Sequence, residues 1–178
     1  PFSLNFYRWF FAGLILFPFT FKELIEKKKY IFDNIIFFTI LGVTSITIFN
    51  SIVYYSLYYT QVISGILMIS TIPVWIIFIS SILNIEKTNI FQIIGVVFSL
   101  TGVIFIITKA DLQIIKNLDF NKGDLSMVVA MFSWAVYSAL LKSKKYEISQ
   151  FALLEVVIIT GLIFLTPIYF IEMYLGNV

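Results

Sequence analysis

The longest uncharged stretch of the chain runs from Asn34 to Ile85 and is dominated by Ile, Phe, Tyr, Leu and Val, with scattered Ser and Thr. Crossing the roughly 30 Å hydrocarbon core of a bilayer takes about 20 mostly apolar residues in a helix. The stretch therefore predicts two antiparallel membrane-spanning helices, joined by a tight turn at Tyr58–Gln61. The roughly 10-residue segments of alternating polarity that are typical of a membrane barrel are absent from this sequence.

Charges and turn residues divide the whole chain into six predicted spans, at about 2–21, 34–56, 62–83, 90–107, 125–141 and 151–171. Most connections are short, so neighbouring spans should run antiparallel. The longest connection, Thr108 to Asp124, should lie in water. Asp124 fits an N-cap for the fifth span, and Asn89 with Gln92 resembles a capping box for the fourth. The predicted fold class is an all-α, polytopic transmembrane helix bundle.

Composition supports a membrane protein and excludes several kinds of chemistry. The chain is 60% hydrophobic and 12% charged, with a mean hydropathy of +0.99, whereas a soluble domain has about 25% charged residues. It contains no cysteine and no histidine. Disulfides, Cys or His metal sites, haem ligation and His-based catalysis are therefore excluded within it. We expect neither a metal nor a cofactor, and no nucleic-acid partner.

Lysine placement predicts the orientation of the spans. Loops on one side hold the larger set: Lys22, Lys27, Lys28, Lys29, Lys87, Lys142, Lys144 and Lys145. Loops on the other side hold Lys109, Lys116 and Lys122. The positive-inside rule places the first side in the cytoplasm. The first span should then run from outside to inside, and the sixth from inside to outside.

The first and sixth spans resemble each other although their predicted orientations are opposite. "AGLILFPFTF" (Ala12–Phe21) is similar to "TGLIFLTPIYF" (Thr160–Phe170), and "SLNF" at Ser3 is similar to "SQF" at Ser149. Similar segments of opposite orientation indicate an inverted repeat, which is a common plan of transporters. Chance similarity between apolar helices is the alternative.

Three further segments carry a resemblance to a known family. Tyr58–Ile107 has "YT" entering a span, Pro73 inside it, Glu86 closing it, and Gly95 and Gly102 in the next span. "GDLSMVVAMFSWAVYSALLKS" (Gly123–Ser143) and "YRWFFAGLILF" (Tyr7–Phe17) extend the match. In order and spacing these segments resemble the EamA family of the drug/metabolite transporter superfamily.

The resemblance implies a ten-helix bundle of two inverted five-helix repeats. This chain would correspond to helices two to seven: residues 1–108 to the rest of the first repeat, and 123–178 to the start of the second. The first helix and the last three would be missing from the fragment. The implied activity is transport of small metabolites such as amino acids, often outward and without ATP, in a bacterial inner membrane.

Polar and aromatic residues at helical spacing are the candidates for a solute cavity near the middle of the membrane. In the second span they are Thr47, Asn50, Ser51, Tyr54 and Tyr58. In the third span they are Ser64, Met68, Thr71 and Trp75. In the fifth they are Ser126, Ala130, Ser133, Trp134 and Tyr137. Helix packing through small and polar residues is the alternative for every face.

Proline and glycine within the spans suggest a hinge and close helix contacts. Pro73 removes a backbone hydrogen bond to Ile69 and should bend the third span, either as a hinge for alternating access or as a static kink. Gly95 and Gly102 lie two turns apart on one helix face and should allow close helix approach.

Charged residues within the spans are few. Arg8 should face a partner, a cavity or the outer head-group layer, because a charge at the bilayer centre is costly. For Glu155, a proton-coupling role and exposure at the cytoplasmic interface are the two alternatives. Glu86 and Asp33 should mark cytoplasmic helix ends.

The leading hypothesis is an exporter or exchanger that works by alternating access, with the lipid bilayer and a small solute as partners. Proton coupling, counter-solute exchange and a homo-oligomer stay open. The alternatives are a structural membrane subunit that transports nothing and a membrane-embedded enzyme. No paired carboxylates, phosphate loop or nucleophile–base arrangement appears in the sequence, so we expect no enzymatic activity.

Overall fold

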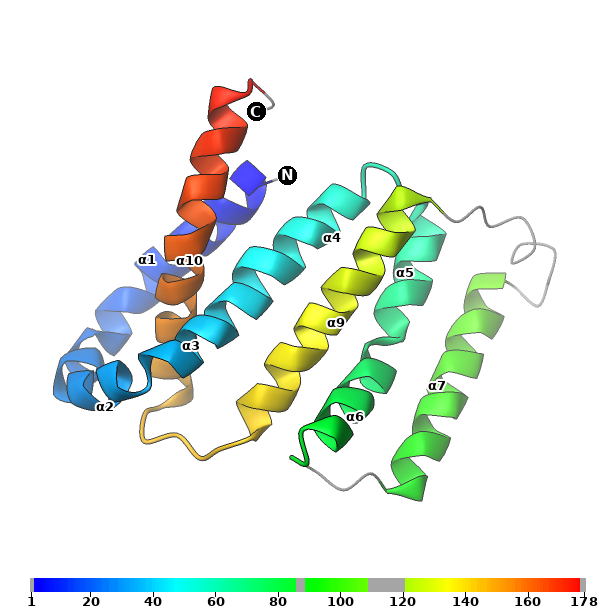
Figure 1. The fold of residues 1–178 in the computed structure, drawn as a ribbon, viewed down its shortest axis with the longest axis horizontal. Coiled ribbons are helices and arrows are strands. Elements are labelled where there is room, and N and C mark those ends of the chain that lie inside the picture. Colours follow the sequence, from blue (N-terminus) through cyan, green and yellow to red (C-terminus); the bar gives the residue numbers. More distant parts are fainter. Residues whose placement is uncertain (1, 86–88, 109–120, 177–178) are drawn as a thin grey trace.

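The computed structural model describes residues 2–85, 89–108 and 121–176, and within these ranges the chain is helical with no strand (Figure 1). The elements are α1 (Phe2–Glu26), α2 (Lys28–Asp33), α3 (Ile35–Gly42), the π-helix η1 (Val43–Asn50), α4 (Ser51–Ser56), α5 (Val62–Ser70), α6 (Ile72–Ile82), α7 (Ile90–Thr108), α9 (Lys122–Lys142) and α10 (Gln150–Tyr174). The predicted all-α bundle is confirmed. Glu86 and most of the predicted loop from Thr108 to Asp124 lie outside the described residues.

The helices that pack side by side are often not neighbours in the sequence. α1 packs against α10, and α10 packs against α3 and η1. α9 lies between the α3–η1–α4 helix and the α5–α6 pair, and α7 contacts α5 at the edge (Figure 1). Neighbouring spans in the chain run antiparallel, as expected from their short connections.

Among the described residues, four helices are long and apolar enough to cross a membrane: Ile35–Ser56, Ile63–Ile82, Lys122–Lys142 and Gln150–Tyr174. α7 contributes a shorter apolar helix, Ile90–Phe105. α1 has the necessary length but carries Arg8 and several polar residues, and it is not among the four. The predicted number of six spans is thus approximate.

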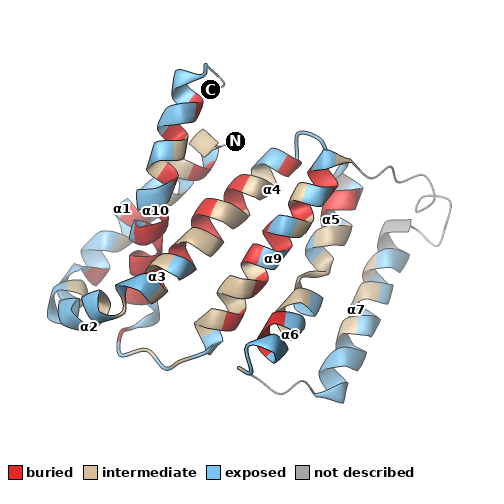
Figure 2. Cartoon of the chain, in the orientation of Figure 1, coloured by how far each residue is buried: buried red, intermediate tan, exposed pale blue. Residues whose placement is uncertain are grey.

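Buried residues concentrate along α10, along the α3–η1–α4 helix and along α9, whereas α7 has no buried residue among those described (Figure 2). The largest core joins α10 to α3 and η1 through Phe38, Leu41, Ile46, Val157 and Leu165. A smaller one joins Met127, Ala130 and Met131 of α9 to the neighbouring helices. Large apolar side chains such as Phe91 and Phe98 are 75% exposed, as expected where a helix faces lipid.

Close helix approach depends on glycines other than the two predicted. A Cβ atom added to Gly161 of α10 would lie 2.7 Å from Ile46 Cβ and 2.9 Å from the Gly42 carbonyl oxygen. A Cβ on Gly42 would lie 2.6 Å from the Gly161 nitrogen. Nothing in the described structure lies within 4 Å of a Cβ added to Gly95 or Gly102. The described residues place no helix close to Gly95 or Gly102; the tight contacts lie at Gly42 and Gly161, between α3–η1 and α10, and at Gly123 of α9.

Helix caps are partly as expected. The amide of Asn89 donates to Gln92 Oε1 over 3.0 Å, and Asn89 Oδ1 accepts from the Phe91 amide, which confirms the predicted capping pair of α7. The prediction of Asp124 as an N-cap is wrong by one turn. Asn121 is the N-cap of α9. Asp124 is at position N3 of the helix and completes the capping box, because its carboxylate accepts a hydrogen bond from the Asn121 amide over 2.8 Å.

The third predicted span is broken rather than bent. α5 ends at Ser70 and α6 begins at Ile72, with Pro73 in the first turn of α6. The hydroxyl of Thr71 donates to the Met68 carbonyl over 2.6 Å, and the Thr71 amide donates to the same oxygen over 2.9 Å. A proline in the first turn of a helix loses no helical hydrogen bond. The interruption therefore has a local explanation at Thr71 and Pro73.

Two reciprocal contacts, which we call the Ser–Glu clamps, tie α1 to α10 at opposite ends. At one end Glu172 accepts from the Ser3 amide and hydroxyl, both over 2.7 Å. At the other end Glu23 accepts from the Ser149 amide and hydroxyl, both over 2.6 Å. Each helix thus supplies a serine at its start and a glutamate near its end. The two helices run in opposite directions (Figure 1), so the two clamps lie at opposite ends of the pair.

Candidate functional site

The candidate site is built on η1, the π-helical middle of the second predicted span. A π-helix is wider than an α-helix and is uncommon beyond a single turn. Three of its carbonyl oxygens accept from side chains: Thr44 from the Ser133 hydroxyl over 2.7 Å, Ser45 from Asn50 Nδ2 over 2.7 Å, and Ile46 from Asn5 Nδ2 over 2.9 Å. Backbone polar groups without water must be paired inside the protein. These side-chain donors therefore stabilise the irregular segment within a span.

Arg8 of α1 reaches the end of η1 and the start of α4. Its Nη2 donates to Asn50 Oδ1 over 2.7 Å, and its Nη1 donates to the Tyr54 hydroxyl over 2.5 Å. The guanidinium lies 5.1 Å from the ring centre of Trp9 and 5.7 Å from that of Tyr54. We call Arg8, Asn50 and Tyr54 the Arg8 cluster. Of the alternatives predicted for Arg8, the structure shows a partnered side chain.

The buried side-chain amide of Asn5 helps to hold α1 in place beside the Arg8 cluster. Asn5 lies one turn before Arg8 on α1, is fully buried, and donates to the Ser51 hydroxyl as well as to Ile46. Its Oδ1 has no hydrogen-bond partner among the described residues, and neither has the buried Nε1 of Trp9. The helix α1 is thereby fixed to η1 through polar contacts, which sets the position of Arg8.

The candidates on α9 gather on another side of η1. Trp134 packs on Phe49 with ring centres 4.5 Å apart, and Tyr137 lies 5.1 Å from Trp134. Ser133 is buried and bonds the η1 backbone. Because Phe49 and Asn50 are adjacent in η1, this aromatic group and the Arg8 cluster flank the same irregular segment.

The remaining candidates lie elsewhere. Met68 and Trp75 pack against the α9 core of Met127, Ala130 and Met131, and Ser64 is buried near the start of α5. Thr71 forms the junction of α5 and α6. Tyr58 was expected on a helix face, but α4 ends at Ser56 and Tyr58 stands 72% exposed in the following turn. The structure therefore does not bring the predicted cavity residues together into one pocket.

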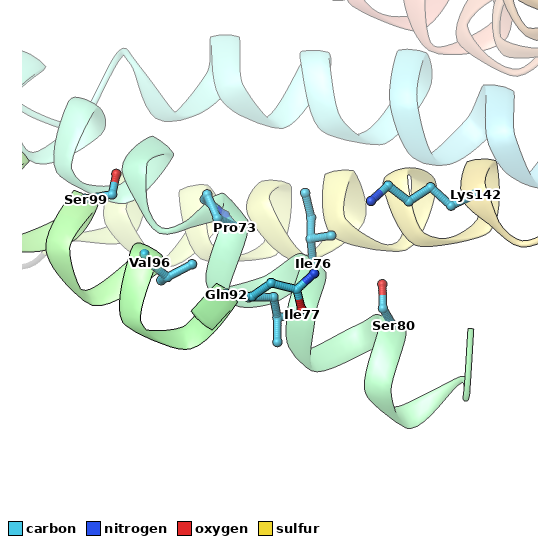
Figure 3. A pocket seen from close by; sticks show the side chains of 9 residues that line it. Pro73, Ile76, Ile77, Ser80, Gln92, Val96, Ser99 and Lys142 are labelled. Atoms are coloured by element: carbon cyan, nitrogen blue, oxygen red, sulfur yellow. The ribbon is translucent and has the colours of Figure 1, made fainter. Parts of the chain in front are cut away.

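An open groove of about 330 Å³ lies beside the helix interruption (Figure 3). Pro73, Ile76, Ile77 and Ser80 of α6, Gln92, Gly95, Val96 and Ser99 of α7, and Lys142 of α9 line it. Of the predicted functional residues it includes only the hinge candidate, Pro73. The buried hydroxyl of Ser80 has no partner among the described residues.

Glu155 is buried rather than exposed, so the expectation of simple exposure at the interface is wrong. It is 2% exposed on the side of α10 that packs against α1, and a Cβ on Gly13 would lie 3.6 Å from its Oε1. Its Oε2 has no hydrogen-bond partner among the described residues. Burying an ionisable group within a membrane is costly, so Glu155 is a candidate functional residue.

Sequence reasoning missed the π-helix and the role of Asn5. The signal for the π-helix was present in "VTSITIFN" (Val43–Asn50), where hydroxyl and amide side chains offer alternative partners to the backbone. Asn5 was a polar residue in an apolar span, a type that is expensive in lipid. Its spacing to Arg8 places both on one face of α1.

Comparison with known proteins agrees with this picture. A family profile described as the EamA-like transporter family matches residues 1–108. A protein named "Uncharacterized transporter YyaM" from Bacillus subtilis is 29% identical over 72% of this chain and 42% of its own length. A protein named "Uncharacterized transporter" from Archaeoglobus fulgidus is 26% identical over 94% of the chain and 56% of its own length.

The chain spans about half the length, or less, of these curated relatives. No solved structure matches it. Since the family profile covers more than half of the chain, and the helices are those of a multi-pass membrane protein, the chain belongs to the EamA-like transporter family.

Proposed function

We propose that the protein is a carrier that moves small metabolites, such as amino acids or their relatives, across a bacterial inner membrane. The observation that carries the proposal is the Arg8 cluster, in which a cation, an amide and a phenol from α1, η1 and α4 meet on an interrupted span. Many transporter sites form where spanning helices are irregular, because backbone groups freed there can bind a solute alongside polar side chains.

The mechanism proposed is alternating access, in which two inverted halves rock around the site. The Ser–Glu clamps support it, because α1 and α10 run in opposite directions and make the same kind of contact at both ends, as two inverted repeats would. The break at Thr71 is the proposed hinge, since few backbone hydrogen bonds hold α5 and α6 in line there. Outward export and exchange are the proposed modes, with a proton or a counter-solute as the coupling partner.

The test is solute flux through the full-length protein in proteoliposomes. Amino acids, nucleosides and common metabolites are first screened for a shift of the melting temperature, and those that bind are then offered as labelled solutes. We expect saturable flux of at least one class, and we expect Asn50→Ala to reduce it with normal insertion. A protein that binds none of them, moves none of them and copurifies with another chain would be a structural subunit instead.

A further inference from the structure

We propose that Arg8 is an anion-binding residue for the solute, and that the solute carries a carboxylate. This inference rests on the proposed transport function and assigns the residue that would recognise the charged group of the solute. It starts from a cation that is held by hydrogen bonds to η1 and α4 and has no counter-charge among the described residues.

The positive charge of Arg8 is partnered only by neutral groups. Both hydrogen-bond acceptors, Asn50 Oδ1 and the Tyr54 hydroxyl, are uncharged. No carboxylate among the described residues forms an ion pair with Arg8, and the one exposed ion pair described is Lys22–Glu26. Neutral acceptors orient a guanidinium without cancelling its charge. The field of Arg8 is thus left available to an anion.

The two acceptors use only part of the donor capacity of the guanidinium. Arginine presents a planar fork of N–H donors that matches a carboxylate through two parallel hydrogen bonds. One donor of Nη1 and one of Nη2 are used by Tyr54 and Asn50. The remaining donors belong to the same plane, and the Arg8 side chain is exposed in this structure. A carboxylate can therefore approach the fork without displacing either partner.

The surroundings favour an organic acid over a hydrated inorganic anion. The aromatic rings of Trp9 and Tyr54 lie within 6 Å of the guanidinium carbon. Such rings present apolar faces to the carbon skeleton of a solute and also stabilise the cation. Asn5 and Ser51 hold the helices around the cluster, so the geometry is formed before binding.

Anionic lipid is the other source of the same chemistry. A phosphate head group would also pair with an arginine near the end of a membrane helix. The two sources differ in one respect that can be measured. A transported carboxylate must compete in solution and cross the membrane, whereas a lipid acts through bilayer composition.

The experiment compares two amino acids with their carboxamides, which lack the negatively charged carboxylate. The full-length protein in nanodiscs is tested with L-alanine and L-phenylalanine and with their carboxamides, and the shift of melting temperature and the dissociation constant are measured. Nanodiscs of phosphatidylcholine alone and of phosphatidylcholine with phosphatidylglycerol form the lipid arm. We expect a carboxylate to bind roughly tenfold more tightly than its amide, because only the carboxylate pairs with the fork.

Variants connect the preference to Arg8. Arg8→Gln should abolish it, and Arg8→Lys, which keeps the charge but loses the fork, should retain it in weakened form. Lys22→Gln is the matched control, because it removes one positive charge from a side chain that is 90% exposed. The melting temperature without ligand shows whether each variant folds.

Three results overturn the inference. They are equal affinity for acid and amide, unchanged carboxylate binding in a folded Arg8→Gln, and stabilisation that depends on phosphatidylglycerol but never on solute. Flux distinguishes this failure from failure of the proposed function. Flux of an uncharged solute that Arg8→Gln leaves unchanged overturns the carboxylate alone. Arg8-dependent carboxylate binding without any flux upholds the inference and contradicts the carrier.

Discussion

At the scale of single residues, polar side chains in the spans fall into two kinds. Thr44, Ser45 and Thr166 donate their hydroxyl hydrogen bonds to backbone carbonyls of the preceding turn, which satisfies them locally. Asn5 and Arg8 instead reach across to another helix. Polar contacts between helices in a membrane restrict how those helices can pack. The second kind therefore marks the positions at which function and architecture coincide.

Glu155 provides a residue-scale prediction. It is buried against α1 and one of its oxygens lacks a partner in the described structure, so it is our candidate for the proton-coupling acid. We predict that Glu155→Gln abolishes solute accumulation driven by a pH gradient but preserves exchange between solute on the two sides. The measurement is flux in proteoliposomes with and without the gradient.

The matched control for Glu155 is Glu147→Gln, since Glu147 is exposed in the loop before α10. Wild-type accumulation in Glu155→Gln would rule out its coupling role. Loss of both accumulation and exchange would show that the side chain is needed for binding or folding instead.

At the scale of elements, the apolar pattern predicted where helices lie, but not how they are interrupted. The apolar pattern did not distinguish an α-helix from a π-helix, because a segment of 8 residues is too short to show a change of period. The split at Thr71 was expected as a bend at Pro73, since a proline alone does not reveal that the preceding helix ends with its own side-chain bond. Local sequence therefore located the irregularity beside Pro73 but gave the wrong form for it, and the π-helix was missed.

The Arg8 cluster could be predicted only in part, for a reason that lies in tertiary packing. Arg8, Asn50 and Tyr54 were each selected from the sequence as polar residues in spans. Their contact depends on how α1 packs against η1 and α4, which are separate from it in the sequence. The contact between Gly42 and Gly161 could not be predicted from the sequence. Glycine allows two helices to approach closely, but the sequence does not show which helices are neighbours.

Alanine substitutions at two glycines should change the stability of the protein in different ways. Gly161→Ala should destabilise the protein by about 1–3 kcal/mol, because the new Cβ meets Ile46 Cβ and the Gly42 carbonyl oxygen. Gly102→Ala is the matched control. It lies within α7 with open space around its Cβ, and it should be neutral or gain up to about 1 kcal/mol from better helix propensity.

Thermal unfolding of both variants in one detergent checks the comparison. A Gly161→Ala protein as stable as wild type would show that α3–η1 and α10 do not approach as closely as described. A large loss in Gly102→Ala would show that α7 packs against something in the full-length protein at this position.

At the scale of the whole molecule, α1 and α10 form a pair that is tied at both ends by the Ser–Glu clamps. Glu23 lies beyond the predicted first span, and the hydrogen bonds from the side chain and amide of Ser149 lower its pKa below the ordinary value of 4.5. A carboxyl whose pKa is lower in the folded chain stabilises the fold above its unfolded pKa. That contribution is lost as the pH falls through the folded pKa.

We predict that acidification from about pH 7 to about pH 4 weakens the Glu23 clamp and lowers the melting temperature. Glu23→Gln should melt slightly lower at neutral pH and lose less on acidification. Glu26→Gln serves as the control, because Glu26 makes only a long 4.0 Å contact with Lys22. If the melting temperature of Glu23→Gln depends on pH in the same way as that of the wild type, the Glu23 clamp does not contribute to stability.

The central claim is that the Arg8 cluster surrounds a solute and is reached in turn from the two sides of the membrane. The sequence has no cysteine, so a single introduced thiol is unique within these residues. Tyr54→Cys in the full-length protein, with any cysteine outside these residues replaced, can be labelled with a membrane-impermeant thiol reagent from either side of oriented vesicles. Tyr54 is half-buried beside Arg8. Alternating access predicts labelling from both sides, and saturating solute should slow it. Labelling from one side only, at a rate that solute does not change, would contradict the claim.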